Sequence, residues 1–199
     1  LERVLLKLIK YSEGVIYVHL DGPKSELNCD QRNIECMRVI EKIANETTNL
    51  RTKFQEMNLG GEMGVTAAID WFFENESLGI IIEEDLDFSE SIFEFVDNFT
   101  YLLEQDRIFA LCMFNPIFNI DYNFYSRHWI PWGWATTREK WEMVRKESAT
   151  KKVRTQFRKV LHPANRYPVR HFLNSVISRV EIGVIATWRS EEHTSELQS

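Results

Sequence analysis

Three consecutive carboxylates, Glu83, Glu84 and Asp85, end a short apolar run and could bind a divalent cation. The run, residues 79–82, has the composition of a strand that is buried on both faces of a parallel sheet. Crowded carboxylates repel one another, and a bound cation relieves that repulsion. Ligands of open α/β sheets bind at the carboxyl ends of strands, so the sequence predicts a metal-phosphate site here. The alternative is a solvated acidic loop or the acid-rich first turn of a helix.

A second acid also follows an expected strand. Asp21 ends the β-branched and aromatic run 15–20, and the Gly22-Pro23 pair behind it favours a turn. Asp21 is therefore expected at the same row of strand ends as the triplet. The residue types are equally consistent with a carboxylate that only caps the turn.

A glycine-rich stretch, residues 58–64, precedes an expected helix and contains Asn58 and Gly60. Such a connection lets a ligand approach the backbone and the helix N-terminus, where anions bind well. It lacks the Gly-Lys-Ser/Thr of a P-loop and does not match the dinucleotide-binding fingerprint. An ordinary loop that leads into a helix explains it equally well.

Aromatic residues gather in the irregular stretch 121–134, where Gly133 separates Trp132 from Trp134. Indole rings beside a polar crevice can stack on a sugar or a base. They can equally anchor a loop in the hydrophobic core.

Hydrophobic periodicity predicts the elements that position these residues. Helices are expected at 1–10, from Asp30 to Ile43, up to Phe73 and at 90–103, and strands at 15–20, 50–55, 79–83 and 108–114. The alternation of helix and strand predicts an α/β fold with a mostly parallel sheet and helices on both faces.

Bulk composition is that of an ordinary globular domain, with 199 residues, 44% hydrophobic and 27% charged. No apolar run reaches the roughly 18 residues of a membrane span, and the three cysteines are spaced too widely for a disulfide framework. A reducing, cytoplasmic location is expected. Residues 127–171 hold 12 basic and 3 acidic residues, which suits either a peripheral contact with anionic lipid or a solvated face.

The two ends have unusual sequences. The chain starts at Leu1, already inside an expected helix, and residues 189–199 match the in-frame translation of a common sequencing adapter. We expect residues 1–188 to be the native part, truncated at both ends, and residues 189–199 to be adapter read-through.

Several of these pieces, in this order, resemble glycosyltransferases of the GT-A fold. They are the strand with Asp-Gly-Pro (21–23), Asn-Leu-Gly (58–60), Ala-Ala-Ile-Asp-Trp-Phe-Phe (67–73), Ile-Ile-Ile-Glu-Glu-Asp (80–85), Asn-Pro (115–116) and Trp-Gly-Trp-Ala-Thr (132–136). The resemblance spans about residues 1–188. It is strongest to bacterial hemolytic-protein-like nucleotide-diphospho-sugar transferases and extends remotely to N-acetylglucosaminyltransferase I.

The resemblance implies transfer of a sugar from a nucleotide-diphospho-sugar to a hydroxyl of a saccharide or lipid-linked acceptor, as in bacterial polysaccharide synthesis, with inversion. No nucleic-acid partner is implied. Asp85 would ligate Mn²⁺ or Mg²⁺ on the donor diphosphate, while Glu83 or Glu84 would contact the donor or metal-bound water. Asp21 would bind the nucleotide base, and Gly22, Asn58 and Gly60 would also bind the nucleotide-sugar. The segment Trp132-Gly133-Trp134 would form one wall of the site for the donor and acceptor sugars. The family pattern is Glu-Asp-Asp, so Glu84 departs from it.

Two parts of the family pattern are missing. The first strand would lie before Leu1, and the general base would follow Thr187-Trp188, where the adapter-like sequence begins. The catalytic residue is thus unassigned, and the fragment alone is expected to be inactive. Two alternatives remain: a nucleotidyltransferase acting on sugar phosphates, and a non-catalytic Ca²⁺- or ligand-binding module. The acids lack the alternating spacing of an EF-hand loop.

Overall fold

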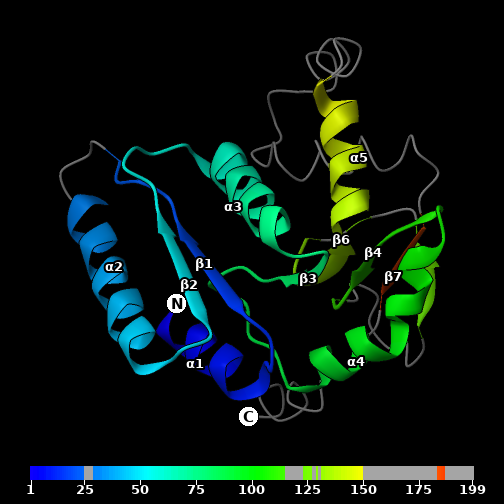
Figure 1. Cartoon of the computed structure of the whole chain (residues 1–199), viewed down its shortest axis with the longest axis horizontal. Coiled ribbons are helices and arrows are strands. Elements are labelled where there is room, and N and C mark those ends of the chain that lie inside the picture. The colour runs from blue at the N-terminus through cyan, green and yellow to red at the C-terminus, as the bar shows by residue number, and fades with distance from the viewer. Residues whose placement is uncertain (25–28, 115–122, 127–128, 130, 150–182, 187–199) are drawn as a thin grey trace, which may run out of the picture. The chain divides into compact units, whose positions relative to one another are not determined.

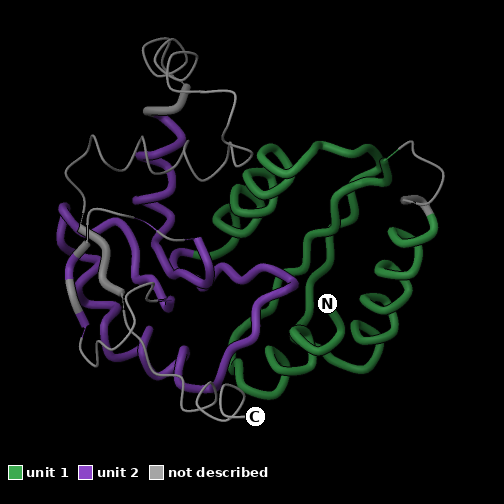
Figure 2. The backbone as a smooth tube through the Cα atoms, turned by 180° about the vertical axis from the view of Figure 1, so that it is seen from behind, with its two compact units in different colours: residues 1–76 green, residues 77–199 purple. Residues whose placement is uncertain are grey.

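The computed structural model describes residues 1–24, 29–114, 123–126, 129, 131–149 and 183–186. The chain is mixed α/β and divides into two compact units, residues 1–76 and 77–199 (Figures 1 and 2). Nothing in the sequence marks the boundary between Glu76 and Ser77 as a linker, because no Gly, Pro or Ser-rich stretch lies there.

The first unit contains three helices and a two-stranded parallel sheet. The elements are α1 (Glu2–Tyr11), β1 (Ile16–Leu20), α2 (Cys29–Glu46), β2 (Leu50–Phe54) and α3 (Gly61–Asn75). These bounds confirm the predicted elements to within a few residues. Helix α2 begins at Cys29, one residue before the start expected at Asp30.

Alternation along β1 places helices on both faces of this sheet, as predicted. Ile16 and Val18 pack with Leu5 of α1 and with Ile40 and Ile43 of α2. Between them, Tyr17 points to the opposite face, where its ring meets the rings of Trp71 and Phe72 in α3 at 5.1 Å each. Side chains of a strand alternate between the two faces of a sheet, so one strand joins both layers.

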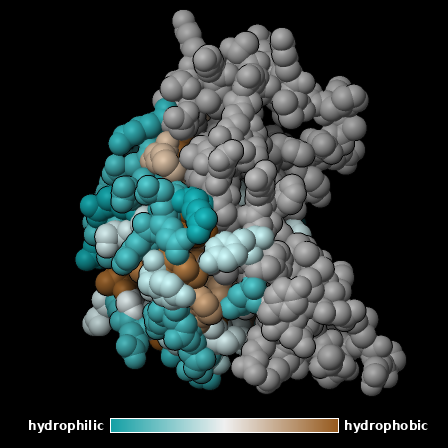
Figure 3. Space-filling model, turned by 90° about the vertical axis from the view of Figure 1, so that its right-hand side faces the viewer, coloured by the Kyte–Doolittle hydropathy of each residue, from teal (hydrophilic) through white to brown (hydrophobic). Residues whose placement is uncertain are grey.

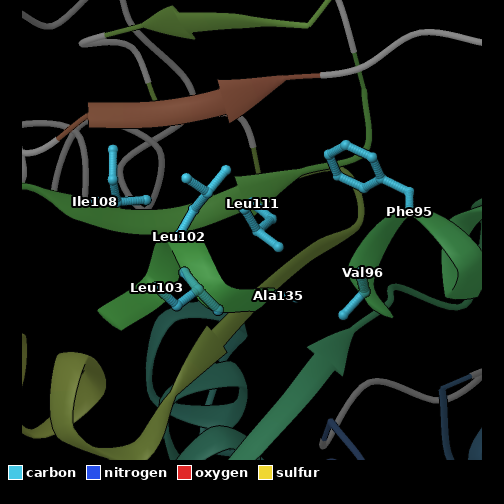
Figure 4. Close-up of a cluster of buried hydrophobic side chains, with 7 residues drawn as sticks. All are labelled: Phe95, Val96, Leu102, Leu103, Ile108, Leu111 and Ala135. Atoms are coloured by element: carbon cyan, nitrogen blue, oxygen red, sulfur yellow. The ribbon is translucent and has the colours of Figure 1, made fainter. Parts of the chain in front are cut away.

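The second unit contains a five-stranded sheet in the order β3-β6-β4-β7-β5. Its elements are β3 (Leu78–Ile81), α4 (Ser91–Phe99), the 3₁₀ helix η1 (Thr100–Glu104), β4 (Ile108–Cys112), β5 (Phe124–Ser126), β6 (Trp134–Thr137), α5 (Arg138–Ala149) and β7 (Gly183–Ala186). One face carries the cluster drawn in Figure 4, in which residues of α4 and η1 pack on β4 and on Ala135 of β6. Residues of β6 alternate, so Trp134 lies on the other face with Trp141 of α5.

The prediction of a mostly parallel sheet is not confirmed by the strands that the structure describes. Strands β1 and β2 are parallel, as are β4 and β7, whereas β3–β6, β4–β6 and β5–β7 are antiparallel. A parallel connection needs a crossover, usually helical, of a dozen or more residues. Among the described strands, β6 enters the sheet antiparallel, between β3 and β4.

Strand β3 also differs from its prediction. It ends at Ile81, it lies at the edge of the sheet that the described strands form, and Leu78 is exposed while Gly79, Ile80 and Ile81 are only half-buried. The expectation of a strand buried on both faces was therefore wrong. A continuous apolar run does not reveal whether one edge of the strand lacks a neighbour.

No helix in the described part of the chain has the length and apolar content to cross a bilayer. The described residues visible in Figure 3 are mostly hydrophilic, with hydrophobic atoms showing only in small areas between them.

Candidate functional site

Each unit carries a row of candidate residues at the carboxyl end of its strands. In the first unit, β1 and β2 are parallel, with Leu20 opposite Phe54, so their last residues lie side by side. The Gln55 amide donates to the Leu20 carbonyl at 3.0 Å and extends the pairing by one residue. Asp21 follows directly and faces the loop that leads into α3.

From the described residues, the Asp21 carboxylate accepts four hydrogen bonds. Oδ1 accepts from the backbone amides of Gly22 (2.9 Å) and Leu59 (2.8 Å). Oδ2 accepts from the Gly60 amide at 3.0 Å and from Asn58 Nδ2 at 3.1 Å. An ionised carboxylate offers about four lone-pair sites, and these contacts use them.

Four of the predicted nucleotide-sugar residues, Asp21, Gly22, Asn58 and Gly60, therefore form one hydrogen-bonded cluster in the first unit. The sequence left open whether Asp21 binds a ligand or caps a turn. Its contacts within the described residues are those of a carboxylate that caps the turn. The cluster ties the end of β1 to the start of α3.

Two further residues hold this cluster, and the sequence analysis missed both. Asn33 of α2 donates from Nδ2 to the Asp21 carbonyl at 2.7 Å. Gly64 packs so closely that a Cβ there would lie 3.2 Å from Asp21 Oδ2. Gly64 belongs to the glycine-rich stretch that was singled out, but its contact with Asp21 was not predicted. Nothing in the sequence near Asn33 indicates that its side chain reaches the Asp21 carbonyl.

Close packing at Gly22 gives a direct test of the cluster. A Cβ at Gly22 would lie 2.2 Å from the Met57 carbonyl carbon, so Gly22→Ala must displace backbone. We expect this change to lower the free energy of unfolding by about 2–3 kcal/mol, as overpacking does, measured by urea denaturation.

The matched control for Gly22→Ala is Gly61→Ala. A Cβ at Gly61 meets nothing within 4 Å, and the residue begins α3. Alanine there should be neutral or stabilise by up to about 1 kcal/mol. Equal stability of the two variants would show that the loop does not pack against Gly22.

His19 lies beside the cluster on β1. Burial lowers the pKa of His19, the Asp21 carboxylate partly opposes that shift, and Lys53 adds to it. The ring Nε2 lies 3.0 Å from Gln55 Nε2. His19 is thus biased towards its neutral form and adds little positive charge next to Asp21.

In the second unit, the acidic triplet forms a turn immediately after β3. The Leu86 amide donates to the Glu83 carbonyl at 3.2 Å, which leaves Glu84 and Asp85 at the exposed tip. Glu83 is half-buried. Exposed carboxylates on a short turn can reach a cation that is also held by substrate phosphates.

The strand register brings the Trp-Gly-Trp segment to the same edge of the sheet. Ile81 of β3 and Cys112 of β4 both pair with Trp134, the first residue of β6. Gly133 adopts φ +70°, its carbonyl accepts from the Met113 amide at 2.9 Å, and a Cβ there would lie 4.0 Å from Leu86 Cδ1. The turn that carries the acids therefore lies beside Gly133.

Trp132 and Trp134, the two tryptophans that were predicted to line the sugar site, have different environments. Trp134 is 2% exposed and packs against Phe109, Trp129 and Trp141, with ring centroids 5.9, 5.0 and 6.4 Å away. This is the core-anchoring alternative that the sequence left open, so Trp134 presents no face to a sugar. Trp132 is half-buried and meets Phe114 edge-on at 4.7 Å, and it is the tryptophan of this segment that a ligand could contact.

The end of β7 completes this row. Strand β7 runs parallel to β4, with Ala186 opposite Cys112, so the carboxyl ends of β3, β4 and β7 and the start of β6 share one edge. The predicted Thr187-Trp188 pair follows β7 directly but lies outside the described residues. So do residues 150–171 of the basic segment.

No known protein-family model matches this chain, and no curated protein matches it. Whether the chain could hold a metal ion must therefore be judged from the side chains that could act as ligands. Within the described ranges, no group of three or more His, Cys, Asp or Glu side chains is arranged to hold a metal ion. A site that relies on one or two carboxylates together with substrate phosphates, as Mg²⁺ sites commonly do, remains compatible with the turn at Glu84 and Asp85.

Proposed function

We propose that this chain is the catalytic part of a GT-A glycosyltransferase that moves a sugar from a nucleotide-diphospho-sugar to a hydroxyl of a saccharide or lipid-linked acceptor. The supporting observation is the shared edge in the second unit, where Ile81, Trp134, Cys112 and Ala186 lie in one row. That register gathers the acidic turn, Gly133 and the carboxyl end of β7.

In this proposal each group at the edge has one task. Asp85 would hold Mn²⁺ or Mg²⁺, which when bound neutralises charge on the leaving diphosphate, and Glu83 or Glu84 would contact the donor or metal-bound water. Trp132 contacts the sugar, and Trp134 supports the segment from the core. Inverting transfer also needs a general base for the acceptor hydroxyl, and none is assigned among the described residues.

The finer fold is part of the same proposal. Within the described residues β1 pairs with β2 alone. Strand β2 carries Arg51 and Lys53, as edge strands often do. The GT-A resemblance implies that a further strand continues the sheet beside β1. Cytoplasmic location and a peripheral membrane contact through residues 127–171 remain proposals.

The test is turnover of a panel of UDP-, GDP-, CDP- and dTDP-sugars by the full-length protein, with Mn²⁺ and with chelator. We expect hydrolysis or transfer with one donor class and its loss on chelation. Turnover of none of the donors would contradict the proposal.

A further inference from the structure

Helix α1 carries the highest net positive charge of the helices that the structure describes. It holds Arg3, Lys7 and Lys10 against one acid, Glu2, which is a net charge of +2. The corresponding net charges are −1 for α2, −3 for α3, −2 for α4 and +1 for α5. Residues 1–76 hold 9 basic and 13 acidic residues, so α1 is a basic element on an acidic unit.

The basic side chains of α1 share the face that is turned away from the core. Residues 3, 7 and 10 are spaced by four and by three, so they lie on one side of the helix. The other side buries Val4 and Leu5. Arg3 and Lys10 are exposed and Lys7 is half-buried, so this charge is presented at the surface.

Two less polar side chains accompany the charges. Leu6 lies between Arg3 and Lys10 on the same face and is 53% exposed. Tyr11 ends the helix, and Lys10 Nζ lies 3.2 Å from its hydroxyl and 4.7 Å from the centroid of its ring. Leu6, Lys10 and Tyr11 are among the residues that line an open hollow on this helix. An apolar side chain among lysines can enter the boundary between headgroups and acyl chains while the ammonium groups stay with the phosphates.

We propose that this face of α1 docks on an anionic phospholipid bilayer. Charge complementarity selects a surface of phosphates, because each basic residue near an anionic leaflet strengthens the attraction about fivefold. The exposed Leu6 favours a bilayer over a soluble polyanion, since only the bilayer offers an apolar phase. This surface is separate from the contact proposed through residues 127–171, and the proposal does not depend on glycosyl transfer.

The first test measures co-sedimentation of the full-length protein with vesicles at low salt. We expect binding to an equimolar mixture of phosphatidylglycerol and phosphatidylcholine, little binding to phosphatidylcholine alone, and weaker binding as salt is added. Lys10→Glu changes two units of charge on this face and should lower the partition coefficient about 20-fold. Lys42→Glu makes the same change at an exposed position of α2 and should stay within about twofold of the unsubstituted protein.

The second test asks whether the contact reaches the apolar phase. Leu6→Ala should lower the partition coefficient about fivefold, because half of a leucine side chain is no longer transferred from water. Ile34→Ala is its control, since Ile34 is 46% exposed on α2, and this variant should bind unchanged. Both pairs replace exposed side chains, so the thermal midpoints should stay close to that of the unsubstituted protein.

Three results would each overturn the proposal. One is equal binding to mixed and to phosphatidylcholine vesicles, and another is equal binding of Lys10→Glu and Lys42→Glu, which places the contact on another surface. The third is unchanged binding of Leu6→Ala, which leaves electrostatic attraction to a polyanion as the only interaction. Vesicle binding is measured without nucleotide sugar, so none of these results bears on the proposed catalytic function.

Discussion

We expect Asp85→Asn to lower the metal-dependent turnover of a nucleotide sugar by about 100-fold or more in the full-length protein. Asp85 lies at the exposed tip of the turn after β3, so its removal changes a charge without leaving a hole in the core. A neutral amide is a much weaker ligand for a hard cation than a carboxylate. A metal that stabilises the leaving diphosphate contributes several kcal/mol, and each 1.36 kcal/mol is tenfold in rate.

Asp97→Asn is the matched control for this variant. Asp97 is also exposed and lies on α4, so the same change of charge is made outside the turn that holds the triplet. Its turnover and thermal midpoint should equal those of the unsubstituted protein. If Asp85→Asn retains full activity, or if both variants lose activity equally, the metal role of Asp85 is wrong.

We expect Trp134→Ala to lower the free energy of unfolding by about 3–5 kcal/mol, as other buried Trp and Phe truncations do. The ring is 2% exposed and lies among Phe109, Trp129 and Trp141. Its loss leaves a cavity between β6 and α5. Urea denaturation that follows the remaining tryptophan fluorescence measures the change.

Trp132→Ala separates a structural tryptophan from a ligand-contacting one. Trp132 is half-buried, so its truncation should cost clearly less stability than that of Trp134. Trp132→Ala should instead raise the KM for the sugar donor or for the acceptor. A loss of stability in Trp132→Ala as large as that in Trp134→Ala would exclude the distinction drawn here.

Local patterns were sufficient to predict most elements. The period of the α1 stripe and the β-branched run of β1 predicted both elements, because each buries one side against the same core cluster. The position of Asp21 directly after a strand also followed from the run 15–20 and the Gly22-Pro23 pair, whereas its contacts with Asn58 and Gly60 did not.

What the sequence could not provide were the contacts that decide between two roles of one residue. Whether Asp21 holds a ligand or a turn depends on the backbone amides of Leu59 and Gly60, 38 and 39 residues away in the chain. Likewise, the antiparallel entry of β6 between β3 and β4 is a non-local pairing, and it decides that Trp134 is buried while Trp132 stays accessible.

The most direct test of the central claim is Mn²⁺ uptake followed by electron paramagnetic resonance, with the full-length protein and a nucleoside diphosphate of the accepted donor class. The account predicts that the signal of Mn²⁺ bound to nucleotide alone changes to that of a protein-bound complex, and that Asp85→Asn abolishes the change while Asp97→Asn preserves it. An identical complex in Asp85→Asn would contradict the claim that this edge of the sheet holds the cation and its diphosphate.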